Sequence, residues 1–125
     1  MKKLLLFLLL AIMLVLTACQ SDIKNGLVVP SWLVGEWENK SYPGKLVNLT
    51  SDDVSFDNGS GYQSIKQNFK DIKTLRSDDN FFEFKFTSGD DTVKYTFEKI
   101  SPEEVKVREN DGKPNTFQRK IINQQ

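Results

Sequence analysis

The chain contains no histidine and only one cysteine. Histidine is the commonest general base and a frequent metal ligand, so its absence removes the usual centre of acid–base catalysis and of transition-metal binding. Thiolate chemistry would depend on Cys19 alone. A glycine-rich phosphate loop and the Gly-x-Ser-x-Gly elbow of hydrolases are also missing. These absences argue against an enzyme, and they leave no catalytic residue or cofactor to predict.

An excess of positive charge is also missing. The 17 basic residues equal the 17 acidic ones, and the formal net charge at pH 7 is zero. Proteins that bind nucleic acid through its phosphates need a surplus of lysine and arginine. We therefore predict no nucleic-acid partner.

The only long apolar run lies at the N-terminus. Lys2 and Lys3 precede an unbroken stretch of thirteen apolar residues, Leu4 to Leu16. A transmembrane helix needs about 20 such residues, so this run is too short to span a bilayer. A basic start followed by a short apolar core is typical of a signal peptide.

The apolar run ends in Leu16-Thr17-Ala18-Cys19. An aliphatic residue and two small residues before a cysteine resemble the lipobox of bacterial lipoproteins. The resemblance implies cleavage after Ala18 and a lipid on Cys19, with palmitate-like chains in the cell membrane and the protein on its extracytoplasmic face. We therefore expect a signal peptide over residues 1–18, a lipidated tether over 19–26 and one folded domain over 27–125.

The mature chain would have neither a free thiol nor a disulfide. Removing Lys2 and Lys3 leaves fifteen basic residues against seventeen acidic ones. The stability of the domain must then come from one apolar core, which about 100 residues can supply.

Alternating polar and apolar residues predict an all-β domain. The clearest pattern is a hairpin over 80–87 and 92–99, where large apolar residues alternate with charged ones. Short strands that recur every 8–12 residues are typical of an antiparallel barrel or sandwich. We expect eight strands, over residues 33–39, 45–50, 53–57, 68–77, 80–87, 92–99, 104–109 and 115–121.

Residues 62–76 are ambiguous between helix and strand. The spacing of Ile65, Phe69, Ile72 and Leu75 fits an amphipathic helix. The turn signal at 78–80 and the strand after it instead favour a hairpin. We expect a loop or one helical turn to about Gln67, followed by a strand.

Both tryptophans lie within one short stretch, Ser31 to Trp37. Gly35 and Trp37 have the same parity on a strand, so a large group can approach the indole over the glycine. Arg119 lies on the apolar face of the last expected strand, where a charge is costly unless it is paired or stacked.

This Gly35-x-Trp37 pair with a late Arg119 resembles the signature of the lipocalin and calycin barrels. The resemblance implies a small eight-stranded, lipocalin-like antiparallel barrel in which the Arg119 guanidinium packs over the Trp37 indole and closes one end.

Five aromatic residues form the apolar side of the central hairpin, and they admit two interpretations. An eight-stranded barrel is just wide enough to be filled by side chains or to hold one small ligand. Short strands and five rings favour a filled core over a cavity. The candidate cavity residues are Phe82, Phe84, Phe86, Tyr95 and Phe97.

Three acidic pairs, Asp52-Asp53, Asp78-Asp79 and Asp90-Asp91, fall at expected turns. Aspartate is favoured there because it hydrogen-bonds nearby backbone, and none of the pairs has the spacing of a calcium loop. We therefore predict turns and no metal site.

Two functions agree with these features. The first is a non-enzymatic, membrane-anchored lipoprotein that binds a small apolar or amphiphilic ligand. The alternative is a protein-interaction module, such as an inhibitor or an envelope-assembly factor, that uses barrel loops and has no ligand cavity. The protein partner and the oligomeric state are not predicted by any motif.

The anchor generates the first test. Cys19→Ala should abolish both lipidation and cleavage between Ala18 and Cys19, because the lipid is attached to the cysteine sulfur. Intact-mass spectrometry of the membrane fraction should show the diacylglyceryl thioether on the wild-type chain alone. A Cys19→Ala protein that matures at position 19 and stays with the membrane would contradict the lipoprotein interpretation.

Overall fold

The computed structural model describes residues 23–120. The predictions for the signal peptide, for Cys19 and for residues 121–125 lie outside the described residues. Within 23–120, no helix is long and apolar enough to cross a membrane.

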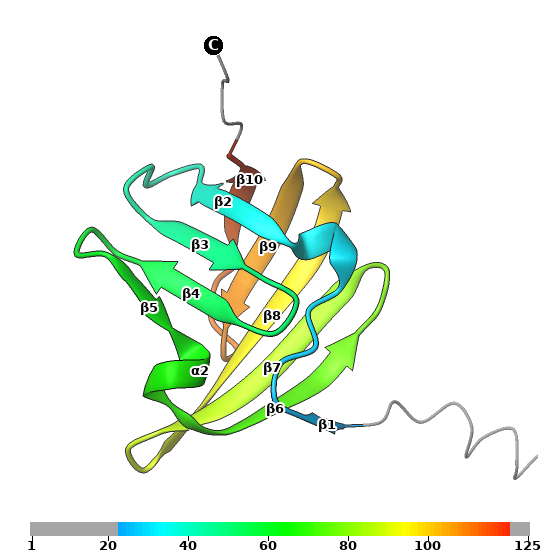
Figure 1. The fold of residues 1–125 in the computed structure, drawn as a ribbon. Helices are drawn as coiled ribbons and strands as arrows, with labels where there is room; N and C mark the ends of the chain where they lie inside the picture. Colours follow the sequence, from blue (N-terminus) through cyan, green and yellow to red (C-terminus); the bar gives the residue numbers. More distant parts are fainter. Residues whose placement is uncertain (1–22, 121–125) are drawn as a thin grey trace, which may run out of the picture.

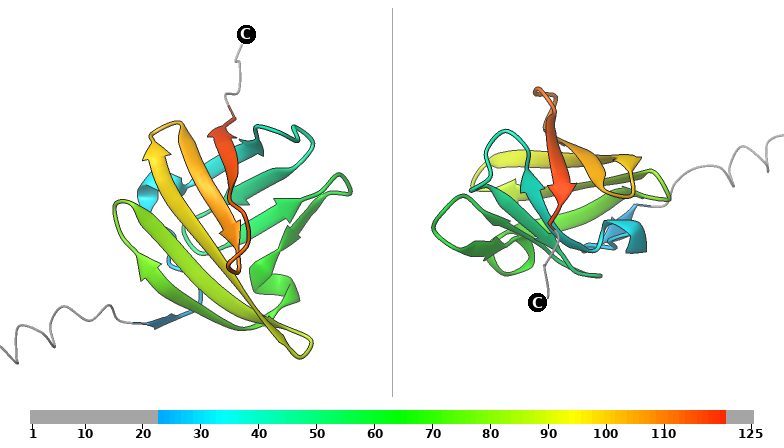
Figure 2. Two further views of the ribbon diagram at one scale, coloured as in Figure 1. Left: turned by 180° about the vertical axis from the view of Figure 1, so that it is seen from behind. Right: turned by 90° about the horizontal axis from the view of Figure 1, so that it is seen from above.

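The described chain forms one antiparallel sheet of ten strands, which curls into a half-barrel (Figures 1 and 2). The strand order is β1-β6-β7-β8-β9-β10-β2-β3-β4-β5, so β10, the last strand, pairs with β2. The strands are β1 (Lys24–Asn25), β2 (Gly35–Asn39), β3 (Leu46–Leu49), β4 (Val54–Asp57), β5 (Tyr62–Ser64), β6 (Lys70–Ser77), β7 (Phe81–Ser88), β8 (Asp91–Ser101), β9 (Glu104–Glu109) and β10 (Asn115–Arg119).

The all-β class is confirmed, but the sheet has ten strands and not the expected eight. Both additional strands are short: β1 has two residues and β5 has three. Such short polar segments carry no alternation that a sequence pattern can reveal, and they become strands only because a neighbouring edge pairs with them. The expected tether therefore joins the sheet at Lys24 and Asn25, which pair with β6.

The ambiguous segment contains both helix and strand. A single helical turn, α2 (Ile65–Asn68), follows β5, and β6 begins at Lys70. The Ser64 side chain caps the turn by accepting a hydrogen bond from the Gln67 N–H. The helical turn followed by a strand is as predicted, while β5 was missed.

The expected strand 33–39 begins two residues late. A 3₁₀ turn, η1 (Ser31–Leu33), follows Pro30, and β2 starts at Gly35. Proline has no N–H to donate to a sheet, so the chain turns before it can pair. The turn still buries Leu33 completely.

The core lies inside the curl of the sheet. Among residues 23–120, fifteen apolar side chains are buried there, and Trp37, Phe82, Phe84 and Phe97 are the largest of these that are fully buried. In β7 the burial alternates strictly, with the three even-numbered phenylalanines inside. The alternation of buried and outward side chains in β7 thus matches the alternation of apolar and polar residues in its sequence.

Residues 26–30 cross the open side of the half-barrel (Figure 1). Leu27 and Val29 are buried along this segment, and the Val29 N–H donates to the Ser51 carbonyl after β3. Thr74 on β6 holds the other end: its Oγ1 accepts from the Val28 N–H at 3.0 Å and donates to the Gly26 carbonyl at 2.7 Å. The segment thus ties β6 to the far side of the sheet.

Thr74→Val tests this tie. Valine has nearly the same shape but leaves both backbone groups without their partner, so we expect a loss of about 1–3 kcal/mol in the free energy of unfolding. Thr92→Val, at an exposed position of β8, is the matched control and should change stability by less than about 0.5 kcal/mol. Equal midpoints in urea for the two variants would show that the Thr74 hydroxyl does not hold the segment.

Candidate functional site

Arg119 and Trp37 form the closed end of the half-barrel. They are direct partners across the β10–β2 pairing, and the guanidinium carbon lies 4.3 Å from the centre of the indole ring. The stacking predicted from the sequence is therefore present. At this distance the cation interacts favourably with the face of the ring.

The guanidinium also binds three backbone carbonyls. Nε donates to the Pro102 carbonyl at 3.3 Å, Nη1 to Val34 at 2.9 Å and Nη2 to Trp32 at 2.7 Å. These carbonyls belong to the β8–β9 turn and to the chain around η1, so one side chain joins three segments. The planar fork of arginine makes this set of bonds, which lysine lacks the geometry to reproduce.

Gly35 is the reason that the guanidinium fits. A Cβ at this position would lie 2.8 Å from Arg119 Nη1, and the φ angle of +134° is one that side chains disfavour. The indole is fixed from its other edge, because Trp37 Nε1 donates to the Leu33 carbonyl at 2.9 Å. The space that the sequence predicted beside Trp37 is thus occupied by Arg119.

The candidate cavity residues lie together in the core. The ring centres of Phe82 and Phe84 are 5.3 Å apart, and Phe84 lies 6.3 Å from Phe97 and 5.6 Å from Tyr95. Phe82, Phe84 and Phe97 are fully buried, and Phe86 nearly so. Stacked at these separations, the rings fill the interior between them.

Tyr95 belongs to both the core and the rim. Its ring stacks on Phe56 with centres 4.8 Å apart, while its hydroxyl donates to Glu109 at 3.1 Å. Burial, together with the Glu109 carboxylate, raises the pKa of Tyr95 above its usual value. The phenol therefore stays neutral at physiological pH.

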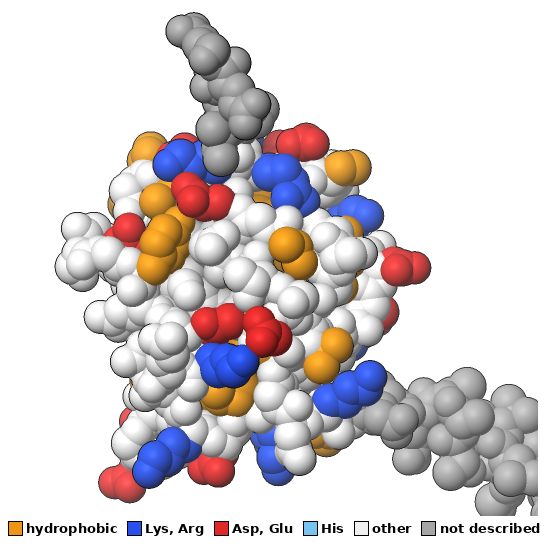
Figure 3. All heavy atoms as spheres, viewed as in Figure 1, with side chains coloured by type: hydrophobic (Ala, Val, Ile, Leu, Met, Phe, Trp, Pro, Cys, Tyr) orange, Lys and Arg blue, Asp and Glu red, His pale blue; other side chains and the backbone are white. Residues whose placement is uncertain are grey.

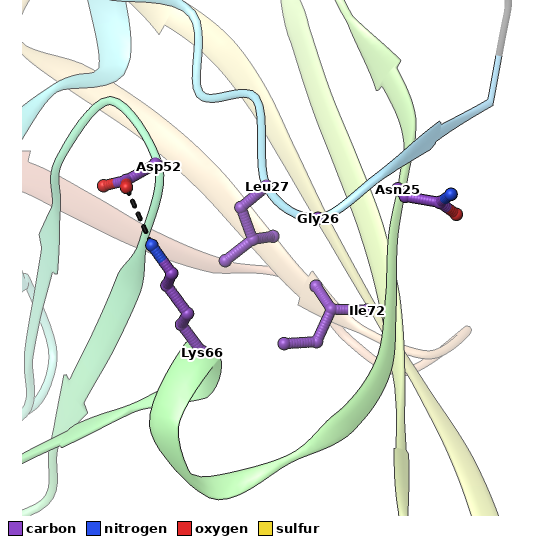
Figure 4. A pocket seen from close by; sticks show the side chains of 6 residues that line it. All are labelled: Asn25, Gly26, Leu27, Asp52, Lys66 and Ile72. Atoms are coloured by element: carbon purple, nitrogen blue, oxygen red, sulfur yellow. Dashed lines mark hydrogen bonds and ion pairs between the residues drawn. The ribbon is translucent and has the colours of Figure 1, made fainter.

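A hollow of about 180 Å³ opens between the segment 26–30, α2 and β6 (Figure 4). Apolar side chains form its inner part, with Leu27 and Ile72 facing each other in the close-up. Lys66 Nζ bridges to Asp52 at 2.9 Å on the rim. The hydrogen bond from Lys66 lowers the pKa of Asp52, so this rim pair is charged at neutral pH. Figure 3 shows acidic, basic and apolar side chains together near the middle of this face.

A second hollow, of about 460 Å³, is wider and lies at the opposite end from Arg119. It is formed by the start of β6 and the β7–β8 turn, and it is lined by Asn68, Phe69, Lys70, Asp71, Thr87, Ser88 and Gly89. The Phe69 ring separates it from the core by packing on Phe86, with centres 4.5 Å apart.

Asp53 and Asp78, one member each of two of the predicted acidic pairs, hydrogen-bond the backbone near turns, as predicted. Asp53 accepts hydrogen bonds from the Val54 and Lys66 N–H groups, and Asp78 accepts from Asn80 and Phe81. Over residues 23–120 no three metal-binding side chains cluster.

Glu36 on β2 interacts with Lys120 and with Tyr62. It pairs with Lys120 at 3.1 Å. Partial burial, together with the Glu36 carboxylate, raises the pKa of Tyr62 to about 12.

Two features of this site were not predicted from the sequence. Asn39 is buried and its Oδ1 accepts from the Ser41 and Tyr42 N–H groups, which shapes the turn after β2. The hollow beside Lys66 depends on a strand pairing and a helical turn that bring distant residues together. The turn-favouring residues Tyr42-Pro43-Gly44, which follow Asn39, were the signal in the sequence for the turn that Asn39 shapes.

Comparisons with known protein families, with curated proteins and with solved structures found no match to this chain.

The closed end generates a stability prediction. Trp37→Ala should lower the free energy of unfolding by about 3–5 kcal/mol, because it empties core volume as well as removing the stacking. Arg119→Lys keeps the charge but loses the fork, and we expect a loss of about 1–2 kcal/mol. Urea unfolding followed by circular dichroism measures both.

A double-mutant cycle separates the stacking from other effects. If Arg119 acts through the indole, Arg119→Lys should have much less effect in a Trp37→Leu background, where the core is refilled without an aromatic face. Strictly additive losses would show that Arg119 acts only through its carbonyl partners. Arg108→Lys, the same exchange at an exposed position of β9, is the matched control and should change stability by less than about 0.5 kcal/mol.

Proposed function

We propose that this protein is a non-enzymatic lipoprotein, anchored by Cys19 to the outer face of a bacterial cell membrane, whose lipocalin-like domain binds another protein through its exterior. The observation that carries this choice is the packing of the candidate cavity residues: the four phenylalanine rings are buried, and the rings of Phe82 and Tyr95 both pack on Phe84. Rings packed in this way favour the outer surface over the interior as the place for binding.

Two geometric features support the lipocalin-like assignment. The first long strand, β2, pairs with both the second and the last, as in a sheet that curls back on itself. Gly35, Trp37 and Arg119 meet at one end in the arrangement that the resemblance implied. Both features depend on the pairing of β2 with β10, which places Arg119 opposite Trp37, 82 positions away in the chain.

The arginine-closed end is the strongest candidate for the binding surface. Around the carbonyls that Arg119 holds, Val34 and Ile100 are 38% and 47% exposed. Trp32 is fixed there by a hydrogen bond from Nε1 to the Asp78 carbonyl, and Lys99 lies over its ring. A rigid surface with exposed apolar side chains loses little entropy on binding, which favours a protein partner.

The second candidate is binding of a small apolar or amphiphilic ligand, which the hollow beside Lys66 favours. Its 180 Å³ is close to an engineered apolar cavity of about 150 Å³ that binds benzene. A ring or a short chain fits this volume, whereas a whole fatty acid does not. The apolar inner part and the charged rim would suit an amphiphile.

Two measurements distinguish the candidates. Site-specific photo-crosslinking in cells should trap a protein from position 34 and not from position 42, because Tyr42 is more exposed than Val34 (58% against 38%) but lies in the β2–β3 turn. Native mass spectrometry and displacement of a hydrophobic dye report a bound small molecule. Two results together would favour the ligand. Crosslinks would form from both positions or from neither, and an amphiphile would displace the dye from the wild-type protein but not from an Ile72→Lys variant.

A further inference from the structure

The sheet separates charge between its two outer faces. Partners across neighbouring strands share a face, so the pairings identify which side chains point outward from β6–β9. We call this outward side the basic face. Its basic residues are Lys70, Lys73, Arg76, Lys85, Lys94, Lys106 and Arg108, and its acidic ones are Glu83, Glu98 and Glu104. The face is turned toward the viewer on the left of Figure 2.

The other side of the half-barrel has the opposite sign. The outward charged residues of β2–β5 are Glu36, Glu38 and Asp57, and Lys120 beside them is paired with Glu36. A chain with zero formal net charge therefore presents a basic side and an acidic side. Such a distribution orients a protein in an electric field or beside a charged surface.

Three lysines face one another across the middle of the basic face. Lys73 on β6 pairs with Lys85 on β7, and Lys85 pairs with Lys94 on β8. Like charges directly opposite each other destabilise a sheet. In residues 23–120, the only ion pair recorded for this row joins Lys94 to the fully exposed Asp111 at 3.9 Å. The row therefore carries an electrostatic cost that an anionic surface would relieve.

The predicted tether joins the sheet beside this row. Asn25 on β1 pairs with Lys73, so the edge of the basic face is where the chain leads back toward Cys19. Cys19 is five residues before Lys24, a distance of at most about 18 Å in an extended chain. A lipid on Cys19 would thus hold the lysine row close to the bilayer. This step rests on the proposed lipid anchor.

We propose that the basic face docks on the anionic lipid headgroups of the membrane that holds Cys19. The tether supplies a high effective concentration, and the lysine row then lies within the distance at which the negative leaflet attracts cations. Docking in this orientation turns the acidic β2–β5 side away from the membrane.

Lysine labelling in lipid nanodiscs tests this docking. The mature protein, purified with its lipid, is placed in nanodiscs of phosphatidylcholine alone or with phosphatidylglycerol, and an impermeant amine reagent is quantified by mass spectrometry. Labelling of Lys73, Lys85 and Lys94 should fall about threefold or more in the anionic discs and recover in about 0.5 M salt, where screening is strong. Lys45 and Lys120 are the internal controls and should not change.

A charge-neutralised variant identifies the row as the cause. In Lys73→Gln/Lys85→Gln/Lys94→Gln, the two remaining lysines of the basic face, Lys70 and Lys106, should lose their protection in anionic discs. The matched control Lys45→Gln/Lys113→Gln/Lys120→Gln removes the same charge and should keep it. Circular dichroism and urea midpoints confirm that both variants are folded.

The outcomes separate docking from anchoring. Intact mass shows whether Cys19 carries lipid; a lipid-free protein would overturn the anchor on which the inference rests. A lipidated protein whose lysines label equally in both kinds of disc would overturn the docking alone. Equal protection of Lys45 and Lys73 would also overturn the docking, because Lys45 lies outside the basic face. Protection in uncharged discs would overturn it as well, because those discs offer no anionic headgroups. Protection that appears only when an acidic protein is added would assign the face to that partner and overturn the membrane.

Discussion

The arrangement of the half-barrel depends on one side chain placed over one ring. Arg119, near the end of the described chain, covers Trp37 and binds the backbone carbonyls of Trp32 and Val34. The contact works only because Gly35 leaves room, and because β10 pairs with β2 in the register that sets the two residues opposite each other. A cation in this place would be costly if it were not stacked and hydrogen-bonded. Removing any one of the three parts therefore affects the other two.

The interior and the outer surface of the half-barrel have different roles. The interior is aromatic and packed, so it supplies stability and little else. The outer surface contains both the rigid apolar end around Arg119 and the charge separation between β6–β9 and β2–β5. The two proposals are compatible, because a domain resting on its basic face would still present other surfaces to a partner. The hollow beside Lys66 lies where the segment 26–30 crosses the sheet opening, and not in the core.

Sequence reasoning located most of the elements and the closed end. The hairpin of β7 and β8 was visible because its phenylalanines alternate with polar residues, and burial follows that alternation. Arg119 stood out because an arginine between apolar residues needs a partner. The two short strands β1 and β5 were missed, since two or three polar residues have no periodicity. The 3₁₀ turn before β2 was missed as well, although Pro30 was the local signal for it.

By itself the sequence determined the all-β class and the strand faces, because both are encoded in alternation. The stacked pair was expected from the resemblance of Gly35, Trp37 and Arg119 to a known signature, together with their inward parity. Only the tertiary structure decided which strands are neighbours. That choice places Lys73, Lys85 and Lys94 in one row and brings Asp52 to Lys66. It also packed the aromatic rings of β7 and β8 against one another in the core. The physical reason is that register and curvature arise from many weak contacts between distant segments, and no local pattern records them.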